Sequence, residues 1–194
     1  TSSSHLNKSA NSASSHTTSN ASNTNDGDFS EVITITNGTT KFQTTASKIS
    51  LPYLHCGYVF YSEGSFDPAT DVEIILLHGA AYTKQDWEDS GILKSLCTLG
   101  NRIVDGKERK RRTSVTALDL SVKSTGEELH SAVYALYDHA NVLSGKPAVV
   151  VSPSASGKAM VELAKYYHED ATQKANGGLL KKMVSALVNV GSPA

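Results

Sequence analysis

The residues with the clearest chemical potential lie around Ser154. Residues 149–158 read as an apolar strand, a tight turn and the start of a helix, with Ser154 at the turn. A serine there is raised above the carboxyl end of its strand on a strained backbone, and the next backbone N–H points to the same spot. The usual G-x-S-x-G glycines are here Ser152 and Ser156, which are also small, and Gly157 adds room where strand and helix nearly touch. This pattern predicts an exposed, nucleophilic hydroxyl at Ser154.

A second motif lies about 75 residues earlier in the chain. Residues 74–77 form an apolar run that continues into a His-Gly pair. Where a nucleophile stands on such a turn, one N–H of the loop after this strand and the N–H after the nucleophile bind a developing oxyanion. The two donors would be Ala80, in preference to Ala81, and Ala155. For His78 we predict a structural role, because a histidine in this position is more often structural than catalytic.

Two other interpretations of the turn compete with a nucleophile. The turn could simply cap the following helix, because serine and proline favour such positions. Residues 156–158 (Ser-Gly-Lys) also resemble the end of a phosphate-binding P-loop. However, Ser152 stands where that loop has its first glycine, and Ala159 stands where a magnesium-binding hydroxyl belongs. We therefore expect no nucleotide and no other cofactor. The occurrence of both motifs in this order favours acyl transfer.

These motifs resemble the α/β-hydrolases and, among them, the α/β-hydrolase domain-containing 14 family. The elbow SPSASG (residues 152–157) is similar to that family's S-P-S-x-S-G elbow. The family's strand, HG pair, Trp and helix are also similar to residues 76–102, LLHGAAYTKQDWEDSGILKSLCTLGNR. The resemblance covers roughly residues 57–194. It implies a cap-less serine hydrolase acting on small acyl esters. One member is described as passing acetyl groups from lysine to coenzyme A and as binding a transcription-factor subunit. Residues 121–126 differ from the family's Pro-Gly-x-Gly-x-Ser loop, so we expect a different substrate rim.

The resemblance thus implies acyl transfer through Ser154, with small acyl esters, thioesters or acyl-lysine as substrates. Such a serine needs a histidine to accept its proton, and the chain order in this fold is Ser, then Asp or Glu, then His. His168 lies fourteen residues along the outgoing helix, about 21 Å away at 1.5 Å per residue. Asp119 follows a strand and is interpreted as a turn cap. We therefore expect the triad Asp and His beyond residue 194, and no histidine or carboxylate of this chain bonded to Ser154. A non-catalytic hydrolase-like subunit or partner-binding protein is the alternative.

The elements around these motifs alternate between strands and helices. Apolar or alternating runs predict strands at 31–36, 57–62, 72–77, 115–118, 148–151 and 183–190, and helical spacing predicts helices at 87–99, 127–142 and 157–167. This alternation predicts an α/β fold with a mainly parallel sheet and helices on both faces. The resemblance implies that this is an α/β-hydrolase fold and that its last strands are lacking. The strand at 183–190 would then be an open sheet edge, available to a protein partner or to further chain.

Composition bounds the remaining questions. Residues 1–30 are rich in Ser, Asn and Thr and predict a disordered tail, so the hydrolase domain would span residues 31–194. A net charge of -1 gives no support for nucleic-acid binding, and we interpret the basic run 107–112 as a solvated loop. No apolar run is long enough to span a bilayer, so we expect a soluble protein, cytoplasmic, nuclear or organellar. Cys56 and Cys97 lack metal-site spacing and are expected to be buried free thiols, with no metal bound.

Overall fold

The computed structural model describes residues 14–15, 32–43, 48–59, 71–98, 102–104, 107–109, 113–138, 142–143, 146–172 and 182–191. Apart from Ser14–Ser15, the predicted disordered tail (residues 1–30) lies outside these described residues. Within the described part, no helix is both long and apolar enough to cross a bilayer.

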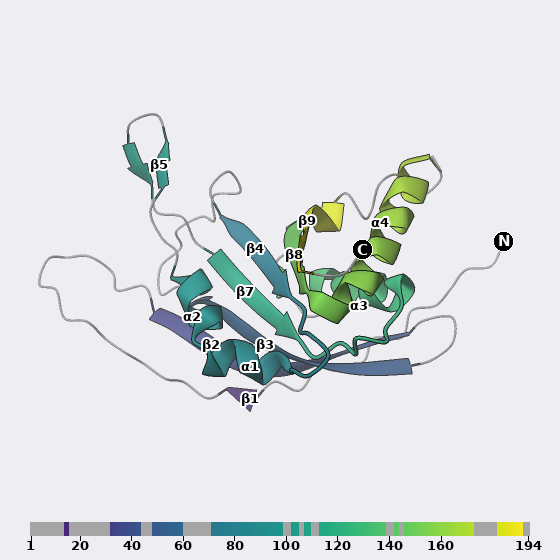
Figure 1. Cartoon of the computed structure of the whole chain (residues 1–194). Helices are drawn as coiled ribbons and strands as arrows, with labels where there is room; N and C mark the ends of the chain where they lie inside the picture. The colour runs from purple at the N-terminus through teal and green to yellow at the C-terminus, as the bar shows by residue number, and fades with distance from the viewer. Residues whose placement is uncertain are drawn as a thin grey trace, which may run out of the picture.

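The centre of the molecule is a mixed seven-stranded sheet in the order β1-β2-β3-β7-β4-β8-β9 (Figure 1). Strands β4, β7, β8 and β9 run parallel, whereas β3 is antiparallel to both of its neighbours, β2 and β7. The strands are β1 (Ser14–Ser15), β2 (Val32–Gln43), β3 (Lys48–Val59), β4 (Val72–Leu76), β7 (Thr113–Leu118), β8 (Ala148–Pro153) and β9 (Val184–Val190). This sheet, with helices on both faces, is the α/β arrangement that the alternation of elements predicted, and it fits the α/β-hydrolase fold that the sequence resemblance implied.

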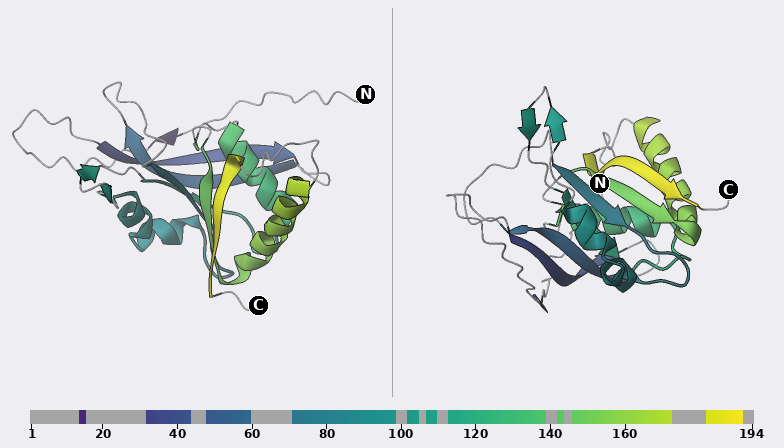
Figure 2. Two further views of the ribbon diagram at one scale, coloured as in Figure 1. Left: turned by 90° about the horizontal axis from the view of Figure 1, so that it is seen from above. Right: turned by 60° about the vertical axis from the view of Figure 1, so that its left-hand side comes forward.

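Two pairs of helices cover the two faces of the sheet. Helices α1 (Lys84–Asp89) and α2 (Ile92–Cys97) lie on one side, and α3 (Gly126–Asp138) and α4 (Gly157–Thr172) lie on the other (Figure 2). A short hairpin of β5 (Arg102–Val104) and β6 (Lys107–Arg109) stands away from the sheet. The basic run 107–112, interpreted as a loop, therefore begins with a strand.

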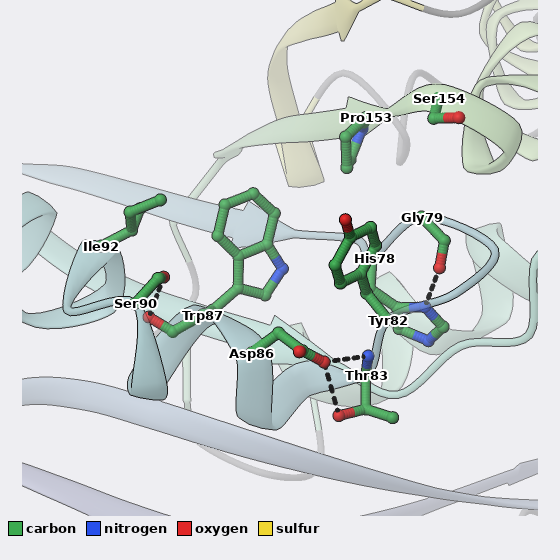
Figure 3. Close-up of a pocket in the computed structure, with 10 residues that line it drawn as sticks. All are labelled: His78, Gly79, Tyr82, Thr83, Asp86, Trp87, Ser90, Ile92, Pro153 and Ser154. Carbon is green, nitrogen blue, oxygen red and sulfur yellow. Dashed lines mark hydrogen bonds between the residues drawn. The ribbon is translucent and has the colours of Figure 1, made fainter.

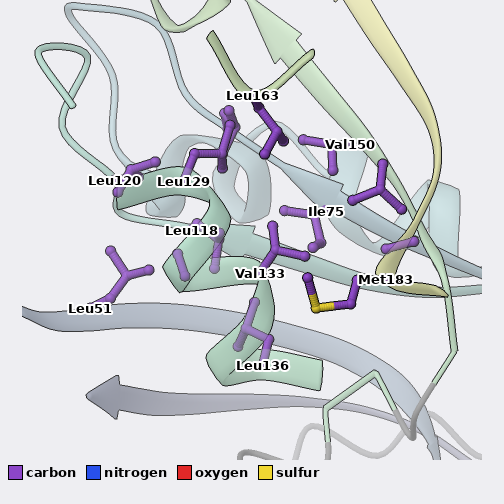
Figure 4. Close-up of a cluster of buried hydrophobic side chains, with 14 of the residues drawn as sticks. Leu51, Ile75, Leu118, Leu120, Leu129, Val133, Leu136, Val150, Leu163 and Met183 are labelled. Atoms are coloured by element: carbon purple, nitrogen blue, oxygen red, sulfur yellow. The ribbon is translucent and has the colours of Figure 1, made fainter. Parts of the chain in front are cut away.

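Each face has its own hydrophobic cluster because successive side chains of a strand point to opposite faces. In β4, Ile75 joins the cluster under α3 and α4, while Leu76 joins the cluster under α1 and α2. Figure 4 shows the larger cluster, in which side chains from α3 and α4 meet the sheet; its fully buried members include Leu118, Leu129, Val133, Leu136, Val150 and Leu163. Cys56 and Cys97 are not joined by a disulfide, and both are buried in the other cluster, as expected.

Several element boundaries differ from the sequence prediction. The predicted helix 87–99 is two helices, because Gly91 adopts a left-handed φ of 74° and its N–H bonds the Glu88 carbonyl at 2.8 Å. Helix α1 begins earlier than predicted, at Lys84, after the N-cap Thr83. Strand β3 begins at Lys48 instead of 57 and includes Pro52. The ladder tolerates this proline because β7 pairs with β3 only from Tyr53 onward, at residues 53–56.

Strand β9 ends the described sheet, as predicted for residues 183–190. It pairs with β8 in parallel, from Ala148↔Val184 to Pro153↔Val190. Val188 and Val190 are 42% and 55% exposed. The partner expected at this edge stays a prediction.

Candidate active site

Ser154 stands at the junction between β8 and α4. Strand β8 ends at Pro153, a single 3₁₀ turn spans Ser154–Ser156, and α4 starts at Gly157. Ser154 has a φ of 52°, the only positive φ of a non-glycine residue in the described chain, and its side chain is exposed. Such a backbone costs about 1–3 kcal/mol and persists only where its surroundings hold it in place. The strand-turn-helix position, the strain and the exposure are as the spacing predicted.

Two buried serines support the turn from below. The hydroxyl of Ser156 donates to the Pro153 carbonyl at 2.8 Å, and its oxygen lies 2.9 Å from the Ser152 hydroxyl. Because Ser156 uses its only proton on the carbonyl, Ser152 is the donor in the second bond. Both side chains are at most 3% exposed, yet each hydroxyl has a partner. The serines that replace the usual glycines therefore form a small hydrogen-bonded bracket under Ser154.

The loop after β4 lies against this turn. Strands β4 and β8 are neighbours, with Leu76 opposite Val151, and the N–H of Leu77 extends the ladder to the Val151 carbonyl at 2.9 Å. A Cβ atom placed on Gly79 would lie 3.7 Å from the Cβ of Ser154. The two sequence motifs, about 75 residues apart, thus meet at the carboxyl ends of β4 and β8.

His78 is held in place by two contacts of its ring. Its Nδ1 donates to the Gly79 carbonyl at 2.9 Å, and its Nε2 lies 3.4 Å from Oδ1 of Asp119. The same Asp119 oxygen accepts the backbone N–H of Lys84 at 3.4 Å, which ties the end of β7 to the start of α1. His78 is 8% exposed. The structural role predicted for this histidine fits these contacts, and Asp119 joins three segments in addition to following its strand.

The two predicted oxyanion donors each follow one of the residues that meet at the turn: Ala80 follows Gly79, and Ala155 follows Ser154. Ala80 lies in the turn closed by the Tyr82 N–H, which donates to the Gly79 carbonyl at 3.1 Å. Ala155 lies in the 3₁₀ turn immediately after Ser154. Both residues are exposed. Their role in binding an oxyanion stays a prediction.

A cavity of about 260 Å³ opens beside Ser154, and sequence reasoning missed it (Figure 3). Pro153 and Ser154 line it from β8, while Tyr82, Trp87 and Ile92 line it from the segment after β4. The indole N–H of Trp87 donates to the Leu77 carbonyl at 3.1 Å, which ties the ring to the end of β4. The residue that could have indicated the cavity from the sequence is this tryptophan, the only one in the chain, which lies ten positions after Leu77.

One carboxylate lies in the lining of this cavity. Asp86 accepts a 2.6 Å hydrogen bond from the backbone N–H of Thr83 and a 3.1 Å bond from the Thr83 hydroxyl. These bonds lower the pKa of Asp86 below its ordinary value, so that the exposed side chain is ionised at neutral pH. The cavity therefore combines apolar walls with one negative charge.

The remaining histidines lie on β3 or α3, or have side chains outside the described residues. His55 lies on β3, where its Nδ1 is 2.9 Å from the Thr116 hydroxyl, and burial lowers its pKa to about 4. His130 lies on α3. The side chains of the other four, His5, His16, His139 and His168, lie outside the described residues. The expectation that no histidine or carboxylate of this chain reaches Ser154 stays a prediction. Among described residues, no three His, Cys, Asp or Glu side chains are grouped to hold a metal ion.

Comparison with known proteins adds likeness of fold alone. No protein-family profile and no curated protein matches the chain. A prohormone-processing carboxypeptidase from Saccharomyces cerevisiae is 10% identical (TM-score 0.46), over 84% of this chain and 39% of that one. A candidate carboxylesterase from Lactobacillus plantarum is 11% identical (TM-score 0.48), over 83% and 60%. A peroxisomal α/β-hydrolase from S. cerevisiae is 12% identical (TM-score 0.42), over 87% and 46%. The chain thus spans 39–60% of the length of these structures.

Proposed function

We propose that this chain carries the nucleophilic half of a serine hydrolase or acyltransferase, with Ser154 as the nucleophile. The observation that carries the proposal is the placement of Ser154 on a strained turn at the carboxyl end of β8, next to Gly79. A hydroxyl held clear of the sheet, with backbone N–H groups from two loops nearby, suits attack on an acyl carbon. The proposed substrates are small acyl esters, thioesters or acyl-lysine.

The proposed reaction is acyl transfer in two steps. The Ser154 oxygen bonds to the acyl carbon, while the hydroxyl proton passes to a general base and from there to the leaving group as the old bond breaks. The N–H groups of Ala80 and Ala155 hold the oxyanion, and water or another acceptor then releases the acyl group. His78 is not placed to be the base, because its Nδ1 proton is bonded to Gly79 and its Nε2 faces Asp119.

Resemblance to the α/β-hydrolase domain-containing 14 family supports the choice of small acyl substrates. The support rests on the elbow at residues 152–157 and on residues 76–102. We further propose that residues 31–194 belong to one hydrolase-type domain preceded by a tail at 1–30. Limited proteolysis should then remove the tail and leave a resistant fragment that begins near residue 31.

Labelling with a fluorophosphonate probe tests the nucleophile. In protein that includes the general base, we expect labelling by the probe, and Ser154→Ala should lose at least 99% of it, because the probe bonds only to an activated serine. Ser95→Ala, at an exposed serine on α2, is the matched control and should be labelled like the wild type. Equal labelling of Ser154→Ala would move the nucleophile elsewhere. A wild type without labelling would favour a non-catalytic, hydrolase-like binding protein.

A further inference from the structure

The cavity beside Ser154 is unusually apolar for a surface feature. Tyr82 is 59% and Ile92 is 41% exposed, although large apolar side chains are normally covered. Both line the cavity, together with Trp87 and Pro153. Exposed apolar side chains that gather around a hollow mark a binding site more often than isolated ones do. The composition of the walls therefore points to an apolar ligand group.

The position of the cavity indicates which part of a substrate enters it. An acyl carbon bound to Ser154 carries its chain on one side and its leaving group on the other, and the leaving group must face the general base. The cavity walls come from the segment after β4 and from Pro153. The only histidine in these walls, His78, has one ring nitrogen bonded to the Gly79 carbonyl and the other facing Asp119. This side of Ser154 thus suits the acyl chain.

We propose that this cavity is an acyl-chain pocket selecting neutral, apolar acyl groups of medium length. The assignment to the acyl chain rests on the proposed function of Ser154, whereas the binding of an apolar group does not. A dry cavity of about 150 Å³ holds a benzene ring of six carbon atoms. The present cavity is larger, at 260 Å³, and open at its mouth. It would hold a chain of about six to eight carbon atoms.

The carboxylate of Asp86 adds selection by charge. It lies in the lining and keeps its negative charge, since the backbone N–H and hydroxyl of Thr83 bond the ionised form. An acyl chain that ends in its own carboxylate would bring a like charge next to it. The pocket should therefore reject dicarboxylic acyl groups and accept neutral chains of the same length.

The chain contains a built-in reporter of this pocket. Trp87 lines the cavity and is the only tryptophan of the protein, so all tryptophan fluorescence comes from a residue in this wall. We would titrate the full chain with acetamide, hexanamide, the anionic adipic monoamide and hexylammonium, following Trp87 emission. Hexanamide should bind roughly tenfold to a hundredfold more tightly than acetamide, since each buried CH₂ contributes up to about 0.8 kcal/mol. The adipic monoamide should bind at least fivefold more weakly than hexanamide.

Variants locate the binding. Ile92→Ala should weaken hexanamide about fivefold and leave acetamide unchanged, and Asp86→Asn should reduce the discrimination against the adipic monoamide. Val161→Ala, at a 54% exposed valine of α4 outside the pocket, is the matched control and should bind as the wild type does. Equal affinity for acetamide and hexanamide would overturn the proposal. So would an unchanged hexanamide affinity in Ile92→Ala. Tighter binding of hexylammonium than of hexanamide would assign the pocket to an amine instead.

An ester series separates this proposal from that of the nucleophile. With 4-nitrophenyl esters and protein that includes the general base, kcat/KM should rise from acetate to a maximum at hexanoate or octanoate and fall at dodecanoate. Ile92→Ala should flatten the rise. If binding depended on ligand length but neither hydrolysis nor probe labelling occurred, the proposed function and the assignment to the acyl chain would be overturned. The cavity would then be an apolar binding site only. Hydrolysis and labelling with no dependence on chain length would overturn the pocket alone.

Discussion

Buried polar side chains differ between two regions of the same sheet, the turn at Ser154 and the sheet interior. At the carboxyl end, the buried hydroxyls of Ser152 and Ser156 both have partners beneath the exposed Ser154. At the amino end of β4, Glu73 is 4% exposed, and its Oε2 has no hydrogen-bond partner in the described part of the chain. His55 of β3 bonds Thr116 and has a lowered pKa. At the site, the buried hydroxyls are hydrogen-bonded and the strain lies in the backbone of Ser154. In the interior, burial favours the neutral forms of Glu73 and His55.

The largest expected effect concerns Glu73. Burial raises its pKa from 4.5 to about 7, and Asp71 adds to the rise, while Lys146 and the Ser114 hydroxyl oppose it. The folded state then binds more protons than the unfolded state between these two values, so stability falls as pH rises from 4.5 to 7. Glu73→Gln should be more stable than the wild type by about 3 kcal/mol at pH 8 and equal to it near pH 4. Urea unfolding at both pH values measures this. An unchanged difference across this range would contradict it.

His55 should show the opposite pH dependence. Its folded pKa of about 4 lies below the ordinary 6.5, so its contribution to stability is complete above 6.5 and is lost as pH falls through 4. Glu73 therefore hides part of this loss in the wild type. In Glu73→Gln, we expect stability to decline by about 2–3 kcal/mol between pH 6.5 and 4, and His55→Asn on that background should remove most of the decline. A flat profile in Glu73→Gln would contradict the assignment to His55.

The serine bracket should show an asymmetry between its two members. Ser156→Ala leaves both the Pro153 carbonyl and the Ser152 hydroxyl without a partner, whereas Ser152→Ala leaves the bond from Ser156 to Pro153 in place. We expect a loss of about 2 kcal/mol for Ser156→Ala and about 1 kcal/mol for Ser152→Ala, measured by urea unfolding. Equal losses would contradict the assignment of Ser156 as the central member of the bracket.

The smallest expected effect is a gain in stability at the site. Ser154→Gly removes the cost of a left-handed backbone, since glycine adopts a φ of 52° without a Cβ clash. Thermal unfolding should show a gain of up to about 1 kcal/mol, together with the loss of probe labelling. Ser154→Ala should lose the labelling without this gain. If Ser154→Gly were less stable than Ser154→Ala, the turn would not be strained.

Local patterns in the sequence were sufficient for the class of fold and for the elbow. The apolar runs at 72–77 and 148–151 identify β4 and β8 because strands buried on both faces are continuously apolar. The small residues at 152, 154 and 156 identify the turn because strand and helix must approach closely there. Both signals depend only on residues next to one another in the chain.

The tertiary structure alone decided how these pieces meet. Placing β8 beside β4 brings Gly79 to Ser154, and the break at Gly91 sets the two short helices that complete the cavity. The contact between His78 and Asp119 likewise depends on the order of the strands. The bond from Trp87 to Leu77 depends on the turn of the chain after β4. Periodicity reports which face of an element is buried, but it carries no information about which element lies opposite. For that reason the position of Ser154 on a strand-to-helix turn could be predicted from the sequence, and the pocket beside it could not.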